Sequence, residues 1–259
     1  ALAWFIVAEL RNPAPLLQIR LLAERNFGIS MAVLTLFAIG MLGGTYLLPL
    51  YMQRGLGYTA LAAGSMFLPV GVIQGVLSAV SGYLTRYVRP LLLSAAGILI
   101  MALSFWLASR FTLHTTHGHI LFILYLRGFG MGLTFAPLNL FSLKNLTQQD
   151  MAAAAGISNS IKQLAGSIGI ALLTVIFSAR TSYHAAHETV SAAQTYVEGV
   201  TDALRVVAVI TLAALLPLLG VFRKKRPGKS GVKGAATPSP GEAVSGKTDK
   251  TTIYRTKPE

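Results

Sequence analysis

Apolar residues dominate six long stretches of the chain, and short polar segments separate them. Each stretch is close to or above the roughly 20 residues that an α-helix needs to cross a bilayer. Most are apolar on every side, as expected for helices that face lipid. The sequence therefore predicts an all-α polytopic membrane protein with six transmembrane helices, at about 27–51, 60–84, 91–109, 119–142, 153–178 and 203–222.

The segments outside these stretches have different characters. Residues 1–8 are apolar and resemble the end of a preceding transmembrane helix, so we expect the chain to be part of a longer protein. Residues 9–26 carry three arginines and are expected to form a cytoplasmic connector. Residues 180–202 predict an outer loop that carries a short amphipathic helix. The basic tail 223–259 is rich in Gly, Pro, Ser, Thr and Lys, a composition typical of disorder.

Composition supports a membrane protein. Hydrophobic residues make up 53% of the chain and charged residues only 12%, against roughly 25% charged residues in ordinary soluble domains. The net charge of +13 could indicate nucleic-acid binding, but the apolar stretches would have no role in such a protein. The chain contains no cysteine, which excludes disulfides and thiolate metal sites.

Basic residues concentrate in alternate connecting segments. The segments 9–26, 85–90, 143–152 and the start of the tail carry ten basic residues together, whereas 52–59, 110–118 and 179–202 carry one arginine each. The positive-inside rule then predicts a cytoplasmic C-terminus. The first and the last three stretches start on opposite sides of the membrane, which is typical of transporters built from two inverted three-helix repeats.

Two basic residues lie well inside apolar stretches and need a reason to be there. A basic side chain at the bilayer centre costs roughly 2.5–3.5 kcal/mol on insertion scales. Arg127 and Lys162 therefore either face a polar substrate cavity, or snorkel or bond to backbone carbonyls. Our candidates for a substrate cavity are Arg127, Asn159, Lys162, Gln163, Gln74 and Gln53.

Small residues and prolines recur inside the apolar stretches. Small residues let two helices approach closely, and a proline kinks a helix. Packing or hinge positions are therefore predicted at Gly40, Gly44, Pro49, Gly71, Gly75, Gly128, Gly132, Pro137, Gly166 and Gly169. No Asp or Glu lies within the six predicted stretches, so we expect the carboxylate of any proton relay to lie outside this segment.

Other site chemistry is weak. Histidines occur at 114, 117 and 119 and again at 184 and 187, without a metal-ligand spacing, so we expect no metal site. The glycines at 128–132 follow no strand, which argues against a dinucleotide site. No nucleophile–base set or Walker loop is visible, and the sequence predicts neither an enzyme nor a bound cofactor.

Several passages together resemble the drug:proton antiporter-2 family, the fourteen-span branch of the major facilitator superfamily that includes multidrug-resistance protein B types. The matching passages keep the family's order over most of residues 9–180. They are RNPAPLLQIRLLAERNF at 11–27, LPLYMQ at 48–53, GYTALAAG at 57–64 followed by Pro69, RGFGMGLTFAP at 127–137 and IKQLAGSIGIA at 161–171.

This resemblance implies that the six helices form the C-terminal half of a facilitator fold in the bacterial cytoplasmic membrane. It implies export of amphipathic or cationic compounds by alternating access, driven by the proton gradient. The missing N-terminal half and, in two-membrane bacteria, a periplasmic adaptor would be its partners. The stretches 27–51, 60–84, 119–142 and 153–178 would line the cavity.

Two positions depart from the family pattern. Lys162 stands where the family often has an arginine, which keeps the charge but loses bidentate bonding. Arg86 and Tyr87 stand where an Asp-Arg pair is common, which puts a charge-paired latch at that loop in doubt. Import of a metabolite, or a non-transporting scaffold or accessory role, remains an alternative to export.

Overall fold

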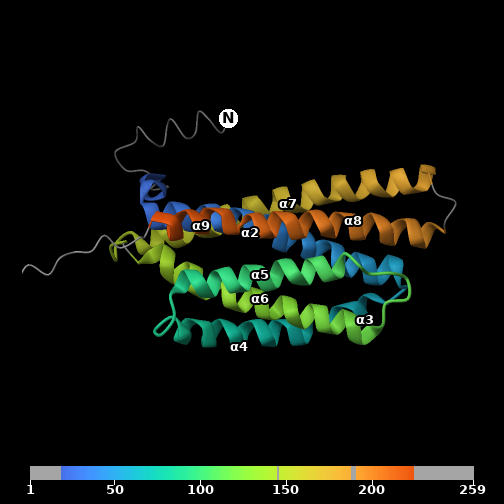
Figure 1. Cartoon of the computed structure of the whole chain (residues 1–259), viewed down its shortest axis with the longest axis horizontal. Coiled ribbons are helices and arrows are strands. Elements are labelled where there is room, and N and C mark those ends of the chain that lie inside the picture. The colour runs from blue at the N-terminus through green and yellow to red at the C-terminus, as the bar shows by residue number, and fades with distance from the viewer. Residues whose placement is uncertain (1–18, 145, 188–190, 225–259) are drawn as a thin grey trace, which may run out of the picture. The chain divides into compact units, whose positions relative to one another are not determined.

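In the computed structural model, residues 19–144, 146–187 and 191–224 are described, and every regular element among them is helical. Six of these segments are long and apolar enough to cross a membrane. The elements in chain order (Figure 1) are η1 (Ile19–Ala23), α2 (Arg25–Leu50), η2 (Tyr51–Gly55), α3 (Ala60–Ser65), α4 (Leu68–Leu84), α5 (Pro90–Ala108), α6 (His117–Leu143), α7 (Met151–His187), α8 (Ala192–Ala213) and α9 (Leu215–Lys224).

Local sequence explains where several helices begin and break. The side chains of Thr59 and Ser191 accept hydrogen bonds from backbone N–H groups in the first turns of α3 and α8, which are N-caps. The predicted helix 60–84 is divided in two, because Pro69 has no N–H to donate to the carbonyl four residues earlier. Pro217 has the same effect between α8 and α9.

The prediction of an outer loop over 180–202 is wrong for most of that segment, but the short helix expected within it corresponds to the first part of α8. α7 continues to His187 and α8 begins at Ala192, so most of that segment is helical. The 37 residues of α7 extend over about 55 Å, well beyond a hydrocarbon core of about 30 Å. Hydropathy marks where the membrane ends, whereas backbone hydrogen bonds carry the helix further.

The longer α8 also includes two carboxylates that precede the predicted stretch 203–222. Glu198 and Asp202 both belong to α8 and to the candidate membrane-spanning segment Ala192–Gly220. The expected helix end at 1–8, the connector up to 18 and the tail from 225 lie outside the described residues. Of the predicted connector 9–26, the described part contains η1 and the start of α2.

The helices pack in two related groups. α6 contacts α4 and α5, and α2 contacts α7 and α8, while α2 also contacts α6 and α5 contacts α8 (Figure 1). Exchanging α2 with α6, α4 with α7 and α5 with α8 maps these contacts onto one another. This is the arrangement of two inverted three-helix repeats that the sequence predicts. The contact between α7 and α8 has no equally extensive counterpart between α4 and α5 among the described residues.

Small residues form the seams between helices. A Cβ atom on Gly40 or Gly44 would overlap Thr211 of α8 or Phe105 of α5. The other predicted glycines of α6 and α7 also lie against a neighbouring helix: Gly128 and Gly132 against α4, and Gly166 and Gly169 against α2. By contrast, no described atom lies within 4 Å of a Cβ on Gly71 or Gly75 of α4.

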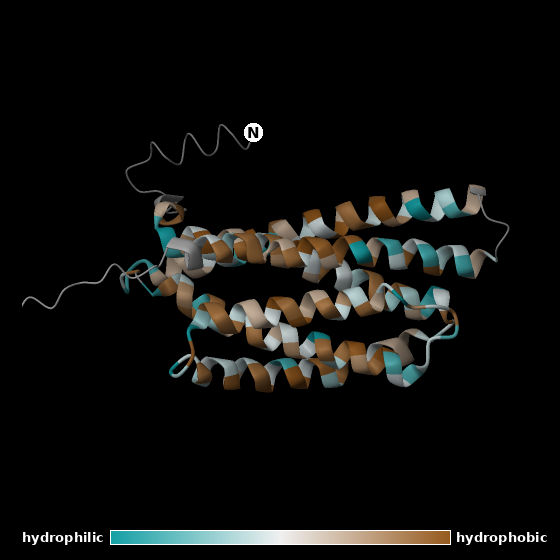
Figure 2. Ribbon diagram, in the orientation of Figure 1, coloured by the Kyte–Doolittle hydropathy of each residue, from teal (hydrophilic) through white to brown (hydrophobic). Residues whose placement is uncertain are grey.

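α4 and α7 each present an apolar face that no described residue covers. Leu68, Val72 and Val76 of α4 are exposed, as are Ile168 and Val175 of α7. Figure 2 shows hydrophobic residues along both helices. Such faces are stable only against lipid or further apolar protein.

Candidate substrate-binding site

A pocket with a cavity volume of about 350 Å³ lies where α2, α6 and α7 meet. Its wall contains both polar and apolar side chains and is therefore amphipathic. The lining residues are Leu34 of α2, Asn139, Ser142 and Leu143 of α6, and Ala155, Ser158, Asn159 and Lys162 of α7. Among these lining residues, Leu34 is buried, whereas Asn139 and Asn159 are exposed.

Lys162 supplies the positive charge of this pocket. Its ammonium group lies 6.0 Å from the centroid of the Phe135 ring of α6, at the outer limit of a cation–π contact. In the described part of the chain no carboxylate lies within ion-pair distance of it. A half-buried ammonium with only an aromatic neighbour can still attract the polar head of an amphipathic molecule.

The glycines of α7 fix where Lys162 lies. Gly166 and Gly169 press against Leu42 and the backbone of Ile39, so α7 approaches α2 closely one turn after Lys162. Small residues at this seam leave the longer polar side chains of α7 at its edge. Asn159 and Lys162 line the pocket there, while Gln163 is exposed and is not among the lining residues.

Arg127 does not line this pocket. Its side chain is 2% exposed. Nη2 donates to the Met41 carbonyl at 3.1 Å and to Thr45 Oγ1, and Nη1 donates to the Gly44 carbonyl at 3.4 Å. The guanidinium also lies 5.2 Å from the centroid of the Phe105 ring. Of the two alternatives for Arg127, the structure favours the structural bond to backbone carbonyls.

The two glutamines are also apart from the pocket. Gln74 is half-buried on α4. Its backbone carbonyl oxygen lies near Gly132 of α6. Gln53 is exposed in the π-helical turn η2. Sequence reasoning missed Asn139. An amide two residues after Pro137 inside an apolar stretch was a usable signal, because such a group needs a partner or a polar cavity.

The chain is similar to known membrane transporters. Residues 3–170 match the model of the Major Facilitator Superfamily. The chain is 30% identical over 184 residues to the uncharacterized MFS-type transporter YhcA of Bacillus subtilis, a match that covers 71% of this chain and 35% of the relative. It is 30% identical over 183 residues to the fatty acid resistance protein FarB of Neisseria gonorrhoeae, covering 71% and 36%.

A third relative is the multidrug export protein EmrB of Escherichia coli K12. The identity is 32% over 192 residues, covering 74% of this chain and 38% of the relative. The matched part thus spans little more than a third of the length of each of these relatives.

Proposed function

Because this chain belongs to the major facilitator superfamily, we propose that it is the C-terminal half of a proton-coupled transporter that exports amphipathic small molecules by alternating access. The chain is an integral membrane protein of a transporter family rather than of an enzyme family. The export direction is supported by the multidrug export relative, and the resemblance to the drug:proton antiporter-2 family is confirmed by the same match.

The observation that carries the proposal is the pocket around Lys162. Its wall combines an ammonium group and two amides with apolar side chains, which suits a molecule that has a polar head and an apolar body. The pocket lies between three helices that the family resemblance assigns to the transport cavity. Moving α2 and α6 relative to α7 would open and close it.

The uncovered faces of α4 and α7 support a second half. Their exposed side chains are apolar, and α4 is among the least buried of the membrane-spanning helices. We propose that the N-terminal half of the transporter covers part of these faces. The bacterial cytoplasmic membrane, a cytoplasmic C-terminus and a periplasmic adaptor remain parts of this proposal, supported by the charge distribution and by the family resemblance.

Lys162 provides the direct test. In the intact transporter, Lys162→Ala should lower the initial rate of substrate efflux from membrane vesicles about tenfold, which corresponds to about 1.4 kcal/mol of lost interaction. Membrane abundance should not change, because the side chain makes no described hydrogen bond or ion pair. Efflux is measured with and without an imposed proton gradient.

Lys144→Ala is the matched control, because Lys144 is exposed at the end of α6 and outside the pocket. Its efflux should equal that of the wild type. Unchanged efflux in Lys162→Ala would remove Lys162 from the mechanism. An efflux rate that is the same with and without the proton gradient would refute proton coupling. Uptake of substrate instead of efflux would favour the alternative function, import of a metabolite.

A further inference from the structure

His184 of α7 lies between two carboxylates of α8. Its Nε2 is 3.1 Å from Asp202 Oδ2, and its Nδ1 is 3.4 Å from Glu198 Oε2. Glu198 and Asp202 are four residues apart and therefore share one face of α8. Between them, a Cβ atom on Gly199 would overlap Thr181 Oγ1 of α7, so the two helices are in close contact at this level.

This geometry distinguishes the protonation states of the imidazole. A neutral ring carries one N–H, which can serve only one of the two carboxylates. The other ring nitrogen would then turn a lone pair toward a carboxylate oxygen. A second proton changes that repulsion into a charge-assisted hydrogen bond. The pair of carboxylates therefore favours the doubly protonated ring.

The two carboxylates are supported unequally. Asp202 Oδ1 accepts a hydrogen bond from Arg205 Nη1 at 2.9 Å, and Arg180 Nε lies 3.9 Å from Oδ2. Glu198 Oε1 accepts only a neutral hydrogen bond, from Gln194 Nε2 at 3.1 Å. Oε2 of Glu198 is buried and has no hydrogen-bond partner among the described residues. The charge of Glu198 is thus the one that gains most from a proton on His184.

Other charged and titratable groups surround the site. The ring of Tyr183 of α7 makes a T-shaped contact with the ring of His184, with ring centroids 5.8 Å apart. His114 of the α5–α6 loop lines the same pocket as Glu198. His187 and Glu188 follow in the sequence, but their side chains lie outside the described residues.

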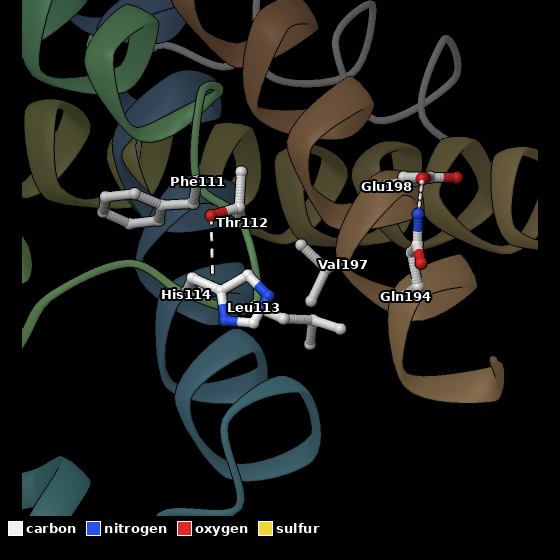
Figure 3. Close-up of a pocket in the computed structure, with 7 residues that line it drawn as sticks. All are labelled: Phe111, Thr112, Leu113, His114, Gln194, Val197 and Glu198. Atoms are coloured by element: carbon white, nitrogen blue, oxygen red, sulfur yellow. Dashed lines mark hydrogen bonds between the residues drawn. The ribbon is translucent and has the colours of Figure 1, made fainter. Parts of the chain in front are cut away.

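That pocket gives solvent access to Glu198, which is among its lining residues. It has a cavity volume of about 200 Å³ and lies between α8 and the α5–α6 loop. Figure 3 shows that the loop contributes Phe111 to His114, while α8 contributes Gln194, Val197 and Glu198. The side chains of His184 and Glu198 are 16% and 31% exposed, so a proton can exchange with solvent.

We propose that His184, Glu198 and Asp202 form a proton-binding site that joins the extended ends of α7 and α8. The three groups do not converge on a common point as metal ligands would, since each carboxylate points at a different ring nitrogen. A bound proton tightens the contact between the two helices, and its loss leaves one of the two carboxylates facing a lone pair of the ring.

The site lies on the side that the positive-inside rule assigns to the outside. α7 also carries Lys162, so protonation here acts on a helix that lines the substrate pocket. This link to transport rests on the proposed function, whereas proton binding itself does not.

The test measures the proton directly. The intact transporter, labelled with 15N-histidine and placed in lipid nanodiscs, is titrated by NMR between pH 5.5 and 8.5, a range of about three units around the ordinary histidine pKa. His184→Gln identifies the signal of His184. Glu198→Gln should reduce the proton affinity of His184 about tenfold, because an opposite charge at this distance is removed.

Asp150→Asn is the matched control, since Asp150 lies at the start of α7, far along the helix from His184. It should leave the titration of His184 unchanged. An unchanged or higher proton affinity of His184 in Glu198→Gln would overturn the proposal.

The wild-type protein provides a second measurement that needs no variant. Amide hydrogen exchange of residues 180–186, corrected for the intrinsic pH effect, should be several-fold slower at pH 6 than at pH 8. Equal protection from amide exchange at both pH values would contradict the proposal that the bound proton holds α7 against α8. Neither readout uses transport, so failure here leaves the proposed efflux function standing, and failure of the Lys162 test leaves this site standing.

Discussion

Arg127→Ala is expected to lower the melting temperature of the purified transporter by about 10 °C, a shift that corresponds to about 3 kcal/mol in a domain of this size. The guanidinium is fully enclosed by α2, α5 and α6 and makes its hydrogen bonds to the backbone and to Thr45 of α2. Alanine removes these bonds and leaves a cavity between helices that cannot fully collapse. Alanine also removes the free-energy cost of burying the guanidinium charge, but this gain offsets only part of the lost stability.

Arg127→Lys sharpens the same prediction. Lysine keeps the charge, but a single ammonium group cannot reproduce the planar fork that serves the carbonyls of both Met41 and Gly44. We therefore expect lysine to destabilise the protein about as much as alanine does. Rescue by lysine would indicate that only the charge matters at this position.

Arg110→Ala is the control, because Arg110 is exposed between α5 and α6. Its melting temperature should match the wild type. Differential scanning fluorimetry in detergent provides the measurement. If Arg127→Ala kept the wild-type melting temperature but lost efflux, a substrate-binding role of Arg127 would be favoured over a structural one.

Gly130→Val is expected to prevent folding, and Gly130→Ala to lower the melting temperature clearly. A Cβ atom at Gly130 would lie 2.9 Å from the Gly97 carbonyl oxygen and 2.9 Å from the Met101 backbone nitrogen of α5. These are backbone atoms, so the helix itself must move. Overpacking of this kind costs about 1–3 kcal/mol for small insertions and more for a branched side chain.

Gly118→Ala is the control for this prediction. Gly118 is also in α6, but no described atom lies within 4 Å of its added Cβ. Alanine there should be neutral or stabilising, since it favours the helix by up to about 1 kcal/mol over glycine. Equal melting temperatures for Gly130→Ala and Gly118→Ala would mean that α5 and α6 can move apart enough to accommodate the added methyl group.

The sequence determined several features by itself. Six apolar stretches of sufficient length predicted the six membrane-spanning helices, because hydropathy depends on composition alone. The predicted glycines of α2, α6 and α7 lie at close helix contacts, since small residues allow them, whereas Gly71 and Gly75 of α4 meet no described atom. Lys162 was found because a charged residue in an apolar stretch needs a reason.

Only the tertiary structure decided which residues meet. Arg127 looked like Lys162 in the sequence, yet its partners are backbone carbonyls 83 and 86 residues away, exposed to it by the packing of α2 against α6. Asn139 joins Lys162 for the same reason. Such pairings depend on helix rotation and crossing, which no local pattern specifies.

The ends of α7 and α8 give the clearest physical reason for what the sequence could not predict. Hydropathy falls where His184, Glu198 and Asp202 occur, so the pattern predicted an outer loop there with only a short amphipathic helix. Backbone hydrogen bonds continue the helices past that point, and the close contact at Gly199 brings the charged side chains together. Composition reports which solvent a residue prefers, whereas packing decides which partners replace that solvent.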